Sequence, residues 1–168
     1  MMATYSIYLV RHGAAEEQGP SYPDDAARPL TKDGIERLRV ETVGLADLDV
    51  HVDRILTSPL VRAVQTAEIL ASGLRCEAPL VATDALRPGG RFDALEAELA
   101  RLGHARSVAL VGHEPSIGEI AARLIGAREP LAFKKGTVCR IDAAALPPSG
   151  AGRLVWHLPP RALRALGR

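Results

Sequence analysis

The chain has 168 residues, 47% apolar and 24% charged, which suits a soluble globular chain that buries one core as a single domain, residues 1–168. Its formal net charge of +1 argues against a general affinity for nucleic acid, so an anion would have to be bound by a local group of arginines. No apolar run approaches the roughly 20 residues needed to cross a bilayer, and no signal peptide is visible, which predicts a cytoplasmic protein without membrane contact.

The two cysteines, Cys76 and Cys139, lie far apart and fit no metal-binding or redox spacing. Two isolated thiols in a chain of this size favour a reducing compartment. His51, His104 and His157 also show no metal-ligand spacing with one another or with the other histidines. We therefore expect no metal and no cofactor.

Short β-rich runs alternate with longer helical patterns along the chain. Strands are predicted at 6–10, 55–57, 77–82, 107–111, 137–141 and 153–157. Helices are predicted at 31–46 with Thr31 as N-cap, and up to Gly73 with Ser58 as N-cap and Pro59 as the first helical residue. Further helices are predicted at 92–102, from Pro115 to Gly126, and in the basic tail after Pro159. This order favours a three-layer α/β/α sandwich with a mostly parallel sheet.

Three polar clusters follow predicted strands directly. Arg11, His12 and Gly13 come after the first strand, Arg62 lies in the helix after the second, and Gly112 and His113 come after the strand at 107–111. Parallel strands present their carboxyl ends at one edge of a sheet, where ligands bind. We expect these clusters to converge there. The polar connection 16–28 is the one long irregular loop, and loops of that length in compact domains are often functional.

Two arginines and two histidines suit phosphoryl chemistry. Guanidinium groups bind phosphate oxygens in a bidentate way. A neutral imidazole, with an ordinary pKa of about 6.5, can attack phosphorus and form a covalent intermediate that water hydrolyses. Neighbouring arginines favour the neutral ring, and Gly13 removes a side chain where backbone is expected to approach phosphate. Taken singly, each residue is better explained as a loop, turn or solvated helix residue, so the prediction depends on their joint placement.

The motifs around these residues resemble the histidine phosphatase superfamily, whose fold is phosphoglycerate mutase-like. They are Leu9-Val10-Arg11-His12-Gly13, Thr57-Ser58-Pro59 with Arg62 and Gln65-Thr66-Ala67, and Val111-Gly112-His113-Glu114-Pro115. Arg28-Pro29-Leu30-Thr31 with Gly34 is similar to the SixA-type phosphohistidine phosphatases. The resemblance implies His12 as nucleophile, with Arg11, Arg62, His113 and Arg28 binding phosphate, and no metal.

One departure from the wider superfamily concerns the general acid. Many members carry a glutamate shortly after the third strand, whereas here the segment 84–90 begins with Asp84 and has no glutamate. An alkoxide leaving group needs a proton from the enzyme, but an imidazole leaves far more easily once protonated. The missing acid therefore favours a phosphoramidate substrate. Asp25 is the candidate for a supporting carboxylate, and Glu16 and Glu17 are weaker candidates. The alternative explanation for each of the three is a solvated loop residue without a role in the site.

The short segment between the predicted strands at 77–82 and 107–111 leaves room for one helix and no lid. An open site favours a phosphorylated protein, such as a histidine-containing phosphotransfer domain or carrier, over a small enclosed substrate. A Lys134–Lys135 pair is a further candidate for attracting an acidic partner, or simply a solvated turn. Two other functions stay open: a phosphatase for a small phosphate ester, and a non-catalytic phosphate-binding module.

Overall fold

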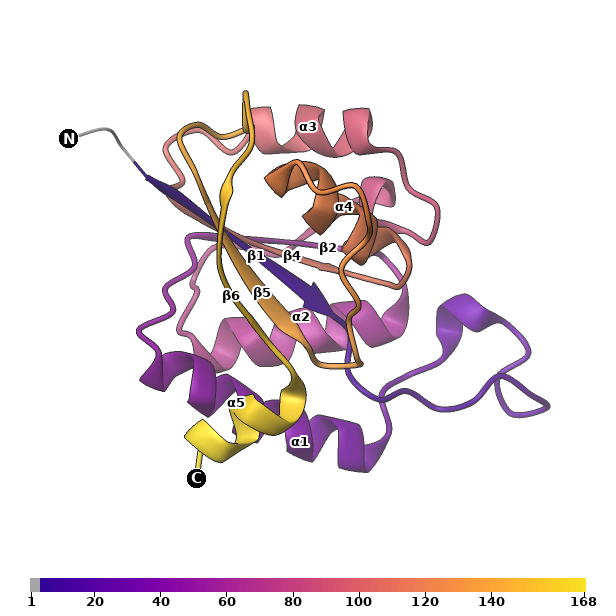
Figure 1. Cartoon of the computed structure of the whole chain (residues 1–168). Helices are drawn as coiled ribbons and strands as arrows, with labels where there is room; N and C mark the ends of the chain where they lie inside the picture. Colours follow the sequence, from indigo (N-terminus) through magenta and orange to yellow (C-terminus); the bar gives the residue numbers. More distant parts are fainter. Residues whose placement is uncertain (1–3) are drawn as a thin grey trace.

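The fold is built on one six-stranded sheet covered by helices on both faces (Figure 1). The structure is a computed structural model that describes residues 4–168. Its strands are β1 (Tyr5–Arg11), β2 (Arg54–Thr57), β3 (Val81–Ala82), β4 (Ser107–Gly112), β5 (Val138–Ala143) and β6 (Arg153–Leu158), in the spatial order β3-β2-β4-β1-β5-β6. The expected three-layer α/β architecture is thus confirmed.

The sheet is mixed, which corrects the expectation of a mostly parallel one. β1, β4, β2 and β3 pair in parallel, but β5 runs antiparallel to β1, and β6 runs antiparallel to β5. The chain returns from the helix after β4 to the carboxyl end of β1 before β5 begins, where the amide of Gly136 bonds the carbonyl of Arg11. β5 therefore starts at the edge where β1 ends and must run the other way.

Each face of the sheet has its own helical layer. One layer contains α1 (Lys32–Asp47), α2 (Val61–Gly73) and α5 (Pro160–Leu166), and the other contains α3 (Phe92–Ala100) and α4 (Ser116–Ile125) (Figure 1). On the first face Leu45, Ala67 and Leu163 pack in one buried cluster, and on the second Leu95 and Ile117 belong to the other. The inward residues of the central strands β1 and β4 are divided between the two clusters, which accounts for their continuous apolar runs.

Several helix ends follow the local sequence signals. Thr31 caps α1 by accepting a hydrogen bond from the amide of Gly34, as predicted. Gly126 ends α4 in the left-handed conformation, with φ of 71°. α2, by contrast, begins at Val61 rather than at Pro59, and its N-cap Leu60 has no side-chain cap. The hydroxyl of Ser58, which was predicted to cap this helix, instead lies 2.8 Å from a histidine ring nitrogen, as described below.

The third predicted strand is much shorter than expected. β3 comprises Val81 and Ala82, whereas the prediction covered 77–82. Pro79 lies in the missing part and has no amide hydrogen to donate to a ladder. Two short 3₁₀ helices, η1 (Asp25–Ala27) and η2 (Asp84–Leu86), lie in connections for which no helix was predicted.

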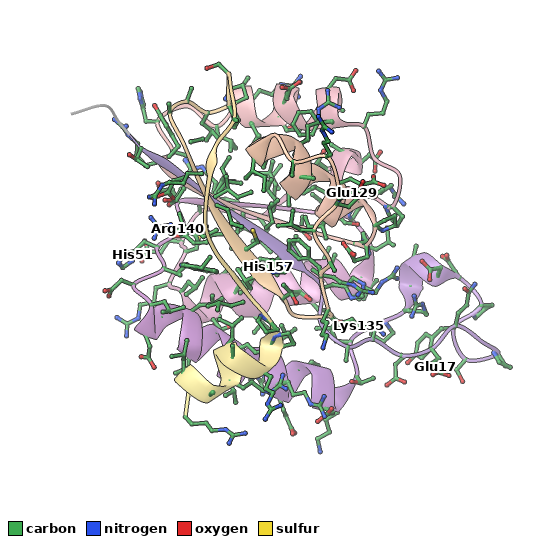
Figure 2. The ribbon with its side chains drawn as sticks, viewed as in Figure 1. Glu17, His51, Glu129, Lys135, Arg140 and His157 are labelled. Atoms are coloured by element: carbon green, nitrogen blue, oxygen red, sulfur yellow. The ribbon has the colours of Figure 1, made fainter. Side chains whose placement is uncertain are left out.

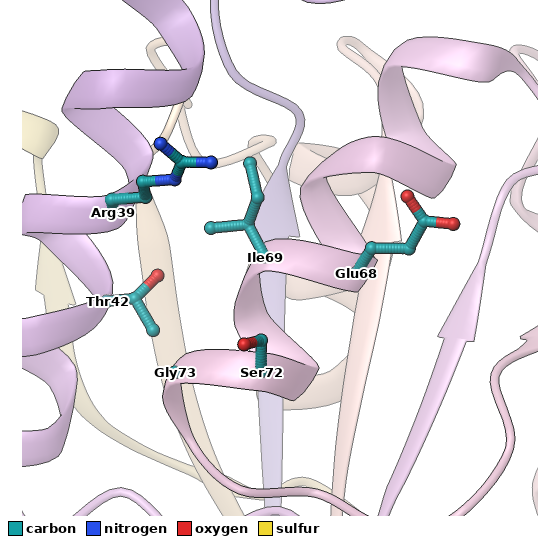
Figure 3. A pocket seen from close by; sticks show the side chains of 6 residues that line it. All are labelled: Arg39, Thr42, Glu68, Ile69, Ser72 and Gly73. Atoms are coloured by element: carbon teal, nitrogen blue, oxygen red, sulfur yellow. The ribbon is translucent and has the colours of Figure 1, made fainter.

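α1 and α2 pack closely on one face of the sheet. At Gly73 an added Cβ would lie 2.3 Å from Cγ2 of Thr42, so the contact requires glycine. A groove of about 400 Å³ runs between the two helices and is lined by Arg39, Thr42, Glu68, Ile69, Ser72 and Gly73 (Figure 3). None of these residues belongs to the polar clusters that the sequence singles out.

Candidate active site

The carboxyl ends of β1, β2 and β4 bring the predicted polar clusters together. The β1–β4 register pairs Arg11 with Gly112, and the next backbone bond runs from His12 N to Gly112 O at 3.1 Å. Ser58 N donates to Val111 O at 2.9 Å, which fixes the start of the β2 loop against β4. The loops that carry His12, Ser58 and His113 therefore leave the sheet side by side.

His12 and His113 form the centre of the cluster. Their ring centroids are 5.1 Å apart, and both side chains are buried. Nε of Arg62, the second residue of α2, lies 3.4 Å from Nε2 of His12. The convergence predicted from the sequence is present in the structure, including residues separated by most of the chain.

Hydrogen bonds fix the tautomer and orientation of the His12 ring. Nδ1 of His12 lies 2.7 Å from the carbonyl oxygen of Gly13, which can only accept, so Nδ1 carries the proton. The amide of Gly13 donates to Thr66 Oγ1 at 3.1 Å, and that hydroxyl donates to the carbonyl of Arg62 at 2.8 Å. Nε2 of His12 is consequently unprotonated, and its lone pair accepts a long hydrogen bond from Arg62 Nε at 3.4 Å.

The surroundings keep both histidines neutral. The pKa of His12 is lowered to about 3, chiefly by burial; the Gly13 carbonyl opposes the shift, and the nearby His113, Arg62 and Arg11 add to it. The pKa of His113 is lowered to about 4, chiefly by burial and then by the charge of Arg62. At neutral pH each imidazole in this site therefore has one unprotonated ring nitrogen.

His113 is held by Ser58. Its Nε2 lies 2.8 Å from Ser58 Oγ, while Nδ1 is buried and has no hydrogen-bond partner within residues 4–168. A buried ring nitrogen without a partner is costly unless a ligand satisfies it. From the sequence, only a capping role was predicted for Ser58, and its position directly before the helix that carries Arg62 was the available signal.

Arg11 reaches the loop that precedes β5. Its Nη1 donates to the carbonyl of Phe133 at 2.7 Å, and its buried Nε has no partner in the described part of the chain. Burial lowers the pKa of Arg11, and the charge of Glu114 opposes that shift. The guanidinium is therefore anchored at one nitrogen and retains donors for an anion.

Asp25 joins the two remaining arginines. Its carboxylate accepts from Nε and Nη2 of Arg28 at 2.9 and 2.7 Å, and from Nη2 of Arg62 at 3.0 Å. Partial burial raises the pKa of Asp25, but the hydrogen bonds from Arg28 and Arg62 outweigh it, so the pKa lies below its ordinary value. The carboxylate is ionised at neutral pH and organises the arginines.

The other acidic candidates lie apart from this cluster. Glu16 contributes its backbone carbonyl, which accepts from Nη1 of Arg28 at 2.7 Å, while within residues 4–168 the carboxylates of Glu16 and Glu17 make no hydrogen bond. Asp84 is exposed and pairs with Arg87 at 2.6 Å. None of the three contacts the histidines.

At Gly13 the structure shows a packing reason for glycine, while the expected approach of its backbone to phosphate stays a prediction. An added Cβ would lie 2.5 Å from Cδ1 of Leu38 in α1, so the missing side chain permits close packing of the loop on that helix. Thr66 and Gln65 were also not assigned roles from the sequence. The Gln65 side chain accepts from the amide of Leu30 at 2.7 Å and so fixes the loop that carries Arg28.

No helix among residues 4–168 combines the length and apolar character needed to cross a membrane. Within the same residues there is no group of three or more His, Cys, Asp or Glu side chains arranged to hold a metal ion.

Comparison with known proteins identifies similar chains. The family model described as "Histidine phosphatase superfamily (branch 1)" matches residues 7–89. The chain is 30% identical to phosphohistidine phosphatase SixA of Escherichia coli (strain K12) over 156 residues, covering 92% of this chain and 93% of that protein. It is 42% identical to an uncharacterized protein of Picosynechococcus sp. over 155 residues, covering 90% and 89% of the two chains.

A solved structure shares the fold closely. The protein histidine phosphatase SixA complexed with tungstate superposes with a TM-score of 0.82 at 28% identity, covering 94% of this chain and 99% of that one. A phosphoglycerate mutase from Bacillus anthracis shares the fold at 16% identity, with a TM-score of 0.68, covering 99% of this chain and 97% of its own.

Proposed function

This chain belongs to the histidine phosphatase superfamily, and from that premise we propose that it hydrolyses phosphohistidine on a protein through a phosphoryl intermediate on His12. The observation that carries the proposal is the state of the His12 ring. Nδ1 carries the proton and is held by the Gly13 carbonyl, so Nε2 is unprotonated, and it accepts only a long hydrogen bond, at 3.4 Å, from Arg62 Nε. The similarity to SixA proteins along nearly the whole chain supports the choice of substrate.

The phosphoryl group is bound by donors that surround Nε2 of His12. Arg62 lies closest to that atom, and Arg11 and Arg28 supply further guanidinium groups. The unpartnered Nδ1 of His113 completes the set, with Ser58 holding the opposite ring nitrogen so that Nδ1–H donates to a phosphoryl oxygen. Donors fixed before the reaction stabilise the charge that develops on the transferring group.

The reaction takes two displacements at phosphorus. In the first, the Nε2 lone pair of His12 forms a bond to phosphorus while the P–N bond of the substrate breaks, and the departing imidazole nitrogen takes a proton from solvent. In the second, water attacks the phosphorylated His12, releasing phosphate and restoring the neutral ring. The Gly13 carbonyl stabilises the positive charge on the ring between the two steps.

The carboxylates near the site support a phosphoramidate substrate. Asp25 is ionised and held by two arginines, and Asp84 is exposed and paired with Arg87. Neither is suited to protonate an alkoxide leaving group, whereas an imidazole does not depend on such an acid. This favours phosphohistidine over an alkyl phosphate.

A protein substrate is favoured by the short connections around the site. Between β3 and β4 the chain forms only η2 and α3, and α3 belongs to the helical layer on one face of the sheet (Figure 1). The proposed carrier is a histidine-containing phosphotransfer domain or a similar protein. A cytoplasmic location is part of the proposal, because Cys76 and Cys139 are free thiols of the kind that reducing compartments preserve.

The test is phosphate release from a phosphohistidine-bearing protein and from a panel of phosphate esters, with wild type, His12→Ala and His51→Ala. His51 is an exposed histidine outside the site, so His51→Ala shows whether removing a histidine elsewhere in the chain also affects activity. We expect release from phosphohistidine by wild type and His51→Ala, and none by His12→Ala. Faster release from esters would support a small-molecule phosphatase, and phosphate binding without release from any substrate would support a binding module.

A further inference from the structure

A charged hollow lies beside the nucleophile and is not used by the proposed chemistry. It has a volume of about 210 Å³ and is lined by Gly13, Ala14, Gly34, Arg37, Leu38, Glu41, Lys135, Pro160 and Arg164. Gly13 and Ala14 are the two residues that follow His12, so the hollow shares a wall with the loop that carries the nucleophile. Its side chains come from α1, from α5 and from the turn before β5.

Lys135 is tied to His12 through the backbone. The next residue, Gly136, donates its amide hydrogen to the carbonyls of Arg11 and His12, at 3.1 and 3.2 Å. Gly136 has φ of 88°, which glycine adopts without strain, and an added Cβ there would lie 2.6 Å from Oε2 of Glu41. The turn therefore holds Lys135 at the catalytic end of the sheet, on the side from which the loop carrying Glu17 projects (Figure 2).

The charges in the hollow leave one cation free. Glu41 is buried and pairs with Arg164 at 2.5 Å, and Arg37 pairs with Asp33 at 2.9 Å. Lys135 is exposed and forms no ion pair within residues 4–168. The lining thus has three cations and one carboxylate, with Lys135 as the group that can accept a new partner.

We infer that this hollow is a second anion subsite, which receives an aspartate or glutamate side chain of the phosphorylated protein while its phosphohistidine lies at His12. The inference rests on the proposed function and adds a specificity determinant to it. A single free ammonium group matches a single carboxylate. A second phosphate fits less well, because the Glu41 carboxylate that lines the hollow repels the two charges of a phosphate dianion more strongly than the single charge of a carboxylate.

The test compares two synthetic phosphohistidine peptides, one with aspartate and glutamate flanking the phosphohistidine and one with asparagine and glutamine in their places. The measured quantity is the ratio of kcat/KM for the acidic peptide to kcat/KM for the neutral one. We expect the wild type to prefer the acidic peptide by about twofold to fivefold, the range that an exposed ion pair supplies. Lys135→Glu is expected to abolish or reverse that preference, and added salt is expected to weaken it in the wild type.

Arg101→Glu is the matched control, since Arg101 is an exposed cation at the end of α3, outside the hollow. It is expected to keep the preference of the wild type. If the wild type hydrolyses both peptides equally, or Lys135→Glu keeps the preference, the subsite is refuted while the proposed function stands. If the wild type releases no phosphate from either peptide but does so from esters, the proposed function fails and the subsite with it.

Discussion

The carboxylate of Asp25 lies 3.0 Å from Nη2 of Arg62, and Nε of the same guanidinium lies 3.4 Å from Nε2 of His12. Asp25 also accepts two hydrogen bonds from Arg28. The Asp25 carboxylate thus accepts hydrogen bonds from Arg28 and Arg62, the same arginines that we propose to bind phosphate. An incoming phosphoryl group must share these donors with Asp25 or displace it, so the carboxylate opposes anion binding while it orders the arginines.

Asp25→Asn is expected to tighten the binding of inorganic phosphate. The amide keeps the size of the side chain but removes the negative charge that competes for Arg28 and Arg62. Because the Asp25 side chain is 42% exposed, its effect is that of a screened pair, about 1 kcal/mol or about fivefold in the inhibition constant. The measurement is inhibition of phosphohistidine hydrolysis by added phosphate.

Asp24→Asn provides the control for this experiment. Asp24 caps η1 by accepting from the amide of Ala26, a role that asparagine also fills, and it has no arginine partner within residues 4–168. Its inhibition constant is expected to equal that of the wild type. An unchanged or weaker phosphate affinity in Asp25→Asn would show that the carboxylate does not compete with the phosphoryl group.

The buried nucleophile makes stability depend on pH. The folded-state pKa of His12 is about 3, chiefly because of burial, and the unfolded-state pKa is about 6.5. Between these values the unfolded chain binds a proton that the folded chain excludes, so the free energy of unfolding falls as the pH falls below 6.5. At pH 5 His12 lowers this free energy by about 2 kcal/mol relative to pH 7.

The corresponding experiment is urea unfolding at pH 7 and pH 5 for wild type, His12→Asn and His51→Asn. His12→Asn does not titrate at this position, so its loss of stability between the two pH values is expected to be about 2 kcal/mol smaller than that of the wild type. His51 is exposed, and its variant is expected to lose as much as the wild type. Equal losses in all three proteins would mean that His12 is not held neutral by the fold.

Much of the fold was predictable because the local signals are strong. Thr31 and Gly126 bound helices as expected, and the apolar runs of β1 and β4 are central strands. Strand direction was not predictable from alternation alone, since a pattern of apolar residues is the same in both directions. The antiparallel pairing of β5 with β6 could have been predicted from the short connection between them, because parallel neighbours need a crossover of a dozen or more residues.

The site was predictable where residues follow strands and less so where they act through side-chain contacts. Arg11, His12, Arg62 and His113 could be placed because the carboxyl ends of strands share one edge. The contact of Ser58 with His113 depends on where α2 begins, and α2 begins two residues later than the proline suggested. The spacing of residues in the sequence does not show that the helix begins later and that Ser58 is thereby left to contact His113.

The Thr66 hydroxyl links α2 to the loop that carries His12. Removing it would show how precisely that loop must be held for catalysis. The hydroxyl accepts from the amide of Gly13 at 3.1 Å, and the Gly13 carbonyl in turn holds Nδ1 of His12. Thr66→Val keeps the side-chain shape but leaves the buried amide without a partner, at a cost of about 1–3 kcal/mol in unfolding free energy. We also expect kcat to fall by about tenfold or more, because small displacements of a reacting group are costly.

Thr42→Val separates these two effects. Thr42 is also buried in a helix and donates to the carbonyl four residues earlier, that of Leu38, at 2.7 Å, as Thr66 does to that of Arg62 at 2.8 Å. Its hydroxyl has no contact with the site, so Thr42→Val should change stability and leave kcat near the wild-type value at a temperature where both variants are folded. If both variants lowered kcat alike, the loss would come from weakened helices, and the Thr66–Gly13 bond would have no particular role in positioning His12.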